Sequence, residues 1–311
     1  MSPTPVSPAR SNRGSHCGRI AVIATHAFTQ LVRMKVFYFL AVFAVIVIGS
    51  NFFDLPQHVG PESAGINVLN SIKNWSIGMM SLFSVVFAIV ATALLLPKDV
   101  EDRTLYTILA KPVPRIDYLA GKLLGVLLLV FVSLALMDVL MTVVLQIRTS
   151  MILSGQMEMA HSRGWPAAEI ASLRADILSQ GPNASLQGAV WAVFLRASIM
   201  ASLALLISTF STSTLFTSIT SFLVYFIGYF QADARDVFLE SGTAGTGWLA
   251  RTVSLVVSLV LPDFHLFNVI DAVIQGQAMP LIRLGELTGI GLFYAVFYVL
   301  ASWFIFAEKE F

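Results

Sequence analysis

The stretch that decides the fold class is YLAGKLLGVLLLVFVSLALMDVLMTVVLQI, residues 118–147, in which only Lys122 and Asp138 are charged. A helix rises 1.5 Å per residue, so about 20 apolar residues cross a hydrocarbon core about 30 Å thick. This stretch is longer than that, and it lacks the regular polar alternation of an amphipathic helix or strand. It predicts a membrane-spanning helix.

The composition of the whole chain agrees with a membrane protein. Of 311 residues, 57% are hydrophobic and 12% are charged, whereas a soluble domain carries about 25% charged residues. Within a bilayer the backbone must satisfy its own hydrogen bonds, which favours helices, so we expect an all-α integral membrane protein. The net charge of +1 indicates no nucleic acid partner, and the single cysteine, Cys17, excludes an internal disulfide.

Five more apolar runs raise the predicted number of spans to six. The full set is 36–53, 75–96, 118–147, 189–210, 212–230 and 287–306. Another apolar run, residues 252–261, is too short to cross and is bounded by Arg251 and Pro262. We expect it to re-enter the membrane or to lie at its surface.

The distribution of lysine and arginine predicts the orientation, because cytoplasmic segments retain basic residues. The first 35 residues contain five basic residues and no acidic one, and residues 97–122 contain five more basic residues. Both segments are therefore expected in the cytoplasm. With six spans the C-terminus also faces inward, in the plasma (inner) membrane, and residues 148–188 and 231–286 face outward.

The N-terminal region predicts a helix before the first span. Its apolar positions and its polar positions fall on separate helical faces, which is typical of a helix lying in the membrane interface. The apolar positions are Ile20, Ile23, Ala27, Leu31 and Met34, and the polar ones are Thr25, His26, Thr29, Gln30 and Arg33. A disordered tail is the alternative. A cleaved signal peptide fits poorly, because the following apolar run is long and no clear cleavage site follows it.

The chain lacks the residues of the common catalytic sites. Its only Gly-Lys pair, Gly121-Lys122, is followed by Leu123 rather than by Ser or Thr, so no phosphate-binding loop is present. The five histidines are scattered singly, so no metal site, catalytic residue or cofactor is predicted. One enzymatic alternative remains open, a Mg²⁺-dependent membrane transferase that uses Asp99 and Asp102.

The cytoplasmic segment after the second span reads PKDVEDRTLYTILAKPVPRIDYLAGKLLG, residues 97–125. Val100, Leu105, Ile108 and Leu109 form an apolar set, and Pro112 ends the helix. The pattern predicts a short amphipathic helix between the second and third spans.

This loop resembles that of the ABC-2 type permeases, the family that includes the permease of the nitrous-oxide reductase maturation system. The matching features are Glu101, the Thr104-Leu105 pair, the Pro-Val-x-Arg turn ending at Arg115, and the Gly-Lys-x-x-Gly sequence of residues 121–125. Further similarity lies in the N-terminal elbow helix, in residues 261–268 and in the charged C-terminus. The resemblance implies a cytoplasmic tail (1–18) and a single transmembrane domain (19–311).

The resemblance also implies a function. The chain would be the permease subunit of an ABC transporter, usually an exporter, and the loop would be a coupling helix docked on a separate ATP-binding subunit. A second permease copy or a paralogue would complete the dimer among the membrane lipids. The implied contact residues are Asp99, Glu101, Arg103, Thr104, Leu105, Ile108, Leu109, Pro112 and Arg115. Two alternatives stay open: a loop that meets only lipid headgroups, and a non-transporting membrane scaffold.

Two charges lie well inside the predicted spans, Asp138 in the third and Arg196 in the fourth. Each is eight or nine residues from the outer end of its predicted helix, and such charges are costly unless paired or hydrated. Equal depth predicts a salt bridge between them, with a role in the substrate path as the alternative. Gly121 and Gly125 form a small face that permits close helix packing.

Overall fold

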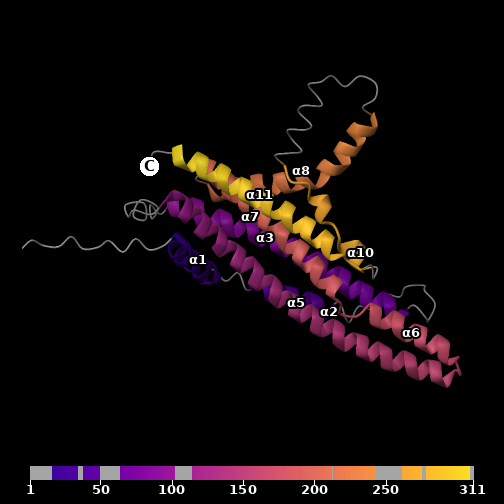
Figure 1. The fold of residues 1–311 in the computed structure, drawn as a ribbon. Coiled ribbons are helices and arrows are strands. Elements are labelled where there is room, and N and C mark those ends of the chain that lie inside the picture. Colours follow the sequence, from indigo (N-terminus) through magenta and orange to yellow (C-terminus); the bar gives the residue numbers. More distant parts are fainter. Residues whose placement is uncertain are drawn as a thin grey trace, which may run out of the picture.

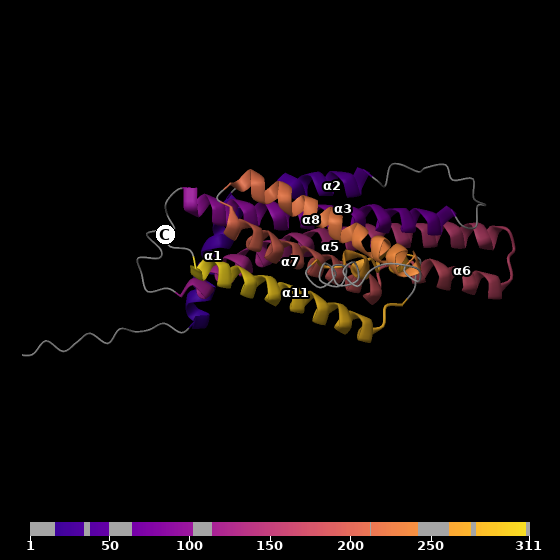
Figure 2. The same cartoon turned by 90° about the horizontal axis from the view of Figure 1, so that it is seen from above.

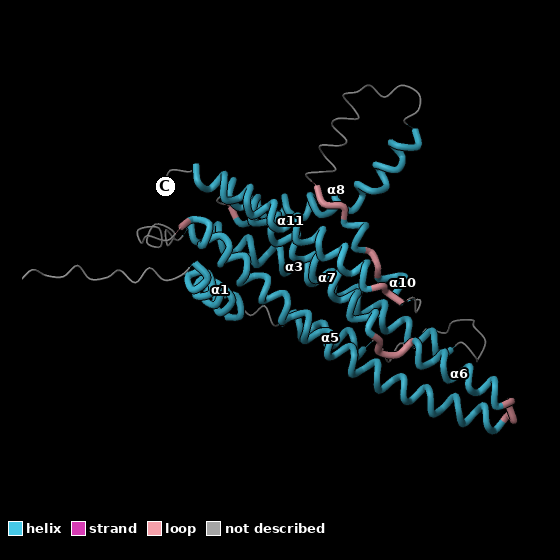
Figure 3. Tube along the Cα trace, viewed as in Figure 1, coloured by secondary structure: helices cyan, strands magenta, loops and turns pink. Residues whose placement is uncertain are grey.

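The computed structural model describes residues 16–33, 38–49, 64–101, 114–211, 213–241, 261–274 and 278–308. In this part of the chain the regular elements are helices, without any strand (Figure 3). They are α1 (His16–Arg33), α2 (Tyr38–Gly49), α3 (Ala64–Glu101), α5 (Arg115–Ser162), α6 (Ala167–Ser179), α7 (Ala184–Phe210), α8 (Thr214–Ser241), η1 (Phe264–Phe267), α10 (Ile270–Ile274) and α11 (Leu281–Glu308).

The long helices form an elongated bundle. α3, α5, α7 and α11 run along the same axis, α1 lies at one end beside the start of α5, and α6 lies at the opposite end (Figure 1). The end of α11 also lies at the α1 end (Figure 2). The opposite end, where α6 and α10 lie, is called the far end below.

Among the described residues, four segments are long and apolar enough to cross a membrane. They are Asn67–Leu95, Arg115–Ser162, Ala167–Phe210 and Leu281–Glu308. These segments cover four of the predicted spans. The predicted spans 36–53 and 212–230 are represented by shorter described helices, α2 with 12 residues and the apolar stretch Thr214–Phe230 of α8. The described part of the chain is therefore all-helical with four candidate spans, and the count of six remains a prediction.

The region after the third predicted span is helical. α5 does not stop at residue 147 but continues to Ser162, and α6 folds back beside it as a hairpin that projects at the far end (Figure 1). Gly164 makes the turn with a φ of 70°, a value that glycine adopts without strain. A helix need not end where its apolar residues end, so the helix extends beyond the predicted span, whose bounds remain a prediction.

α3 is likewise longer than the predicted span 75–96. The helix begins at Ala64 rather than near residue 75, and it continues past Pro97 to Glu101. Proline removes one hydrogen bond of the preceding turn, and here the helix ends four residues later. Three predicted segments fall outside the described residues: most of the cytoplasmic tail, the loop 102–113 and the run 252–260.

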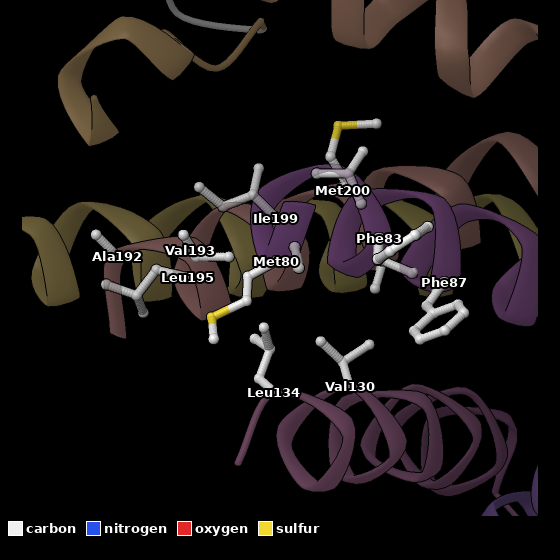
Figure 4. Packing of buried hydrophobic residues seen from close by; sticks show 14 of the residues in the cluster. Met80, Phe83, Phe87, Val130, Leu134, Ala192, Val193, Leu195, Ile199 and Met200 are labelled. Atoms are coloured by element: carbon white, nitrogen blue, oxygen red, sulfur yellow. The ribbon is translucent and has the colours of Figure 1, made fainter. Parts of the chain in front are cut away.

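The core is built around α7. In its most apolar stretch 78% of the residues are buried, against 22% for α11, so α7 is the central helix and α11 a peripheral one. Met80 and Phe83 of α3 belong to one buried cluster that also contains Leu134 of α5 and Ile199 of α7 (Figure 4). The exposed apolar side chains of α11, such as Phe293 and Leu300, suit a lipid environment.

Candidate functional site

The first turn of α5 joins both ends of the described chain. Asp117 is buried, and its carboxylate Oδ2 lies 3.0 Å from Nδ1 of His16 and 3.2 Å from Nε of Arg19, both in α1. A buried carboxylate is costly without such partners, so this contact fixes the start of α1 against α5.

Arg115 and Tyr118 connect the same turn to the last helix. Nη1 of Arg115 donates to the carbonyl oxygens of Phe306, at 2.9 Å, and Ala307, at 2.6 Å. These carbonyls lie in the last turn of α11, where a helix lacks internal donors and a cation is favourable. The ring of Tyr118 stacks on that of Phe306, with centroids 6.3 Å apart. We call Arg115, Asp117 and Tyr118 the α5 junction.

Gly121 and Gly125 lie where α1 crosses α5. A Cβ atom at Gly121 would be 2.7 Å from Cβ of Ile23, and one at Gly125 would be 2.6 Å from Cβ of Ala27. Only glycine permits this separation, so these residues set how closely the two helices approach.

The structure describes little of the predicted contact with an ATP-binding subunit. Asp99 and Glu101 lie in the last turns of α3, and their side chains are not described. The predicted contact residues that lie outside the described part are Arg103, Thr104, Leu105, Ile108, Leu109 and Pro112. Arg115 is the predicted contact residue with a described side chain, and it binds α11 of its own chain.

Toward the far end of the bundle, a buried arginine holds the end of the short helix η1. Nη1 of Arg196 in α7 donates to Oγ of Ser81 in α3 at 3.0 Å, and Nη2 donates to the carbonyl oxygen of Phe267 at 3.1 Å. Phe267 is the last residue of η1. We call residues 261–274, which contain η1 and α10, the strap.

The structure does not bring Asp138 and Arg196 together. Oδ1 of Asp138 instead accepts from Nε2 of Gln187 at 3.2 Å, nine residues before Arg196 on α7. The salt bridge was predicted because Asp138 and Arg196 are equally far from residues 147 and 189, the outer ends of their predicted spans. In the structure α5 continues to Ser162 before the chain folds back. The register of the hairpin is therefore set at Gly164, and it places Asp138 level with Gln187.

Lys73 is a second buried cation near the far end. Nζ donates to Oε1 of Gln180 at 2.6 Å and to the carbonyl oxygen of Ile274 at 3.0 Å. Gln180 lies at the break between α6 and α7, and Ile274 is the last residue of α10. One side chain thus joins α3, the hairpin and the strap.

Sequence reasoning missed Lys73 and Asp117 as site residues. Lys73 lay outside the predicted span, although a lysine at helical spacing after Ile66 and Leu69 is a signal of an intramembrane cation. Asp117 was passed over in a basic loop. An acidic residue in the first turn of a helix is a recognisable signal, because it is favourable at that position.

The chain was also compared with known proteins. The family model described as ABC-2 family transporter protein matches residues 21–310, nearly the whole chain. The chain belongs to the ABC-2 transporter family. The match is to the family as a whole, and it does not extend to the nitrous-oxide reductase maturation system. No curated protein sequence matches this chain.

The family agrees with the helical architecture, and together they identify an integral membrane protein. Membrane proteins of the ABC-2 family are typically the non-catalytic transport subunits of ABC systems. Among the described residues, no group of three or more His, Cys, Asp or Glu side chains is placed to hold a metal ion.

Proposed function

We propose that this chain is the permease subunit of an ABC exporter and is driven by ATP hydrolysis in a separate subunit. The observation that carries the proposal is the family match over residues 21–310. These 311 residues contain no phosphate-binding loop, so the proposal assigns ATP hydrolysis to a separate subunit.

The proposed topology has six spans, with both termini and the coupling loop in the cytoplasm. Its support is the position of α1, the start of α5 and the end of α11 at one end of the bundle (Figure 1). A transporter of this kind needs two membrane halves. The proposal therefore includes a second permease chain, either an identical copy or a paralogue, in the plasma membrane.

The coupling loop is proposed to dock on the ATPase and to pass its motion to the membrane helices. Residue 114 follows the loop directly, and the α5 junction begins one residue later. Because Arg115 holds the end of α11 and Asp117 holds the start of α1, a displacement of this turn would move three helices together. In this proposal Arg115 transmits motion rather than touching the ATPase.

The test is affinity purification of the chain from mild detergent, comparing wild type with a Leu105→Asp, Ile108→Asp variant. An ATP-binding cassette protein should accompany the wild type and be lost from the variant. The matched control is Met159→Asp, Leu178→Asp, which places two carboxylates on exposed apolar positions of the far-end hairpin. This control should retain the ATPase.

The other outcomes separate the alternatives. Retention of the ATPase by all three proteins would place the docking surface elsewhere. Absence of any ATPase, in conditions that keep complexes intact, would contradict the permease function and favour the transferase or scaffold. The transferase would additionally lose its activity when Asp99 and Asp102 are replaced by Asn.

A further inference from the structure

The strap and the segment that follows it are held at four places by residues from three helices, α3, α7 and α8. The ring of Phe264 packs against Gly228 of α8, where an added Cβ would lie 2.8 Å from two ring carbons. After the strap, the backbone N–H of Met279 donates to Oγ of Ser185 in α7 at 3.0 Å. Between these two anchor points, Arg196 and Lys73 hold the carbonyls of Phe267 and Ile274.

Both cations bind the same kind of atom. Phe267 ends η1, and Ile274 ends α10, so each cation caps the carbonyl end of one short helix. Lysine and arginine commonly satisfy such carbonyls and are favoured by the helix dipole. Helices of four or five residues are unstable alone, so the shape of the strap depends on these tertiary contacts.

The attachment is suited to release. In these two contacts the strap contributes only backbone carbonyl oxygens. If the strap moves into water, each carbonyl oxygen can accept a hydrogen bond from water in place of the one from the cation. Arg196 is also incompletely satisfied, because its buried Nε has no hydrogen-bond partner among the described residues. A buried donor left without a partner lowers the advantage of the closed arrangement over an open one.

We propose that Lys73 and Arg196 form a latch that holds the strap across the far end of the bundle, and that its release opens the outward side of the transporter. The direction of opening rests on the proposed function. The latch itself is a property of this chain alone. It would act through positioning, since neither cation needs to contact a cargo.

The test uses a buried thiol reporter in the strap. In a Cys17→Ser background, Val273→Cys places the only thiol on a buried position of α10. A maleimide reagent is applied to the purified protein in mild detergent, and the rate of labelling is followed. Two further single-cysteine reporters serve as references, His265→Cys on an exposed strap position and Ala192→Cys in the core of α7.

Removing the latch should open the strap and leave the core closed. Arg196→Met or Lys73→Met should raise labelling at position 273 by about tenfold, the effect of losing one charge-assisted hydrogen bond on a local opening equilibrium. Labelling at positions 265 and 192 should not change. Arg196→Lys keeps the charge with fewer donors and should give a smaller increase. Arg283→Met, which removes a partly exposed cation paired with Glu286, is the matched control and should have no effect.

Two results would overturn the latch. Unchanged labelling at position 273 in the Arg196→Met, Lys73→Met double variant would show that other contacts hold the strap. A parallel increase at position 192 would show that the cations stabilise the whole bundle. The measurement requires neither nucleotide nor an ATPase, so a failed co-purification would reject the proposed function and leave this test intact.

Discussion

At the α5 junction Asp117 lies between two basic side chains of α1, whereas at the far end Arg196 and Lys73 donate to neutral oxygens. Arg19 is partly exposed, so water shares the solvation of the first cluster. Both far-end cations are almost fully buried. A buried charge is tolerated only when hydrogen bonds replace its hydration, and carbonyl oxygens can supply them without a second buried charge.

The two ends also differ in which atoms pack against a glycine of a long helix. Against Gly125 the nearest atoms include the carbonyl oxygen of Ala24 and the amide nitrogen of Phe28, which belong to the regular helix α1. Against Gly228 they are ring atoms of Phe264 and the carbonyl oxygen of Pro262, at the beginning of the strap. The α1 end is therefore a rigid helix contact, and the far end closes with a short irregular segment.

The largest effect is expected from Gly125→Ala. The added methyl group would overlap backbone atoms of α1, so the helix must move away from α5, at a cost of about 1–3 kcal/mol. The measurement is the thermal unfolding midpoint of the purified protein. Gly155→Ala on the same helix is the control, because a Cβ at Gly155 would meet no atom within 4 Å and should be neutral or stabilising by about 1 kcal/mol. Equal midpoints for Gly125→Ala and the wild type would refute the close α1 contact.

An intermediate effect is expected from the ion pair of the α5 junction. In a double-mutant cycle, Arg19→Gln and Asp117→Asn should each destabilise the protein, with a coupling energy of about 1 kcal/mol. His16→Gln should matter less, because its side chain is 69% exposed. Denaturation of the four proteins of the cycle measures the coupling. Additive losses would mean that Asp117 is held by contacts other than Arg19.

The smallest effect is expected between the two intramembrane charges first considered as a pair. Asp138→Asn and Arg196→Lys should each lower the free energy of unfolding independently, because Asp138 contacts Gln187 whereas Arg196 contacts Ser81 and Phe267. Their coupling energy should lie below about 0.5 kcal/mol, as for independent sites. A coupling energy above about 1 kcal/mol would indicate that Asp138 and Arg196 form a salt bridge, and it would contradict the register of the hairpin.

Local sequence patterns predicted correctly those features that depend on one helix alone. The faces of α1 illustrate this: Ala27 and Leu31 are buried and Thr25 and Thr29 are exposed, as the helical spacing predicts. The apolar runs likewise predicted the four candidate spans. The helices α3 and α5 extend beyond the predicted spans, because helix formation continues through polar residues once a helix has begun, and an apolar run gives only the part that can lie in the membrane.

The amino-acid sequence alone was enough to predict that this protein lies in a membrane, that it is helical, and that it resembles the ABC-2 permeases. Length and apolar composition are enough for the first two, because a bilayer core accepts few backbone structures. The partners of the buried charges were decided only by the tertiary structure. Whether Arg196 meets Asp138 or Phe267 depends on the length of the α5–α6 hairpin and the path of the strap, and such long-range register is not encoded in any local pattern.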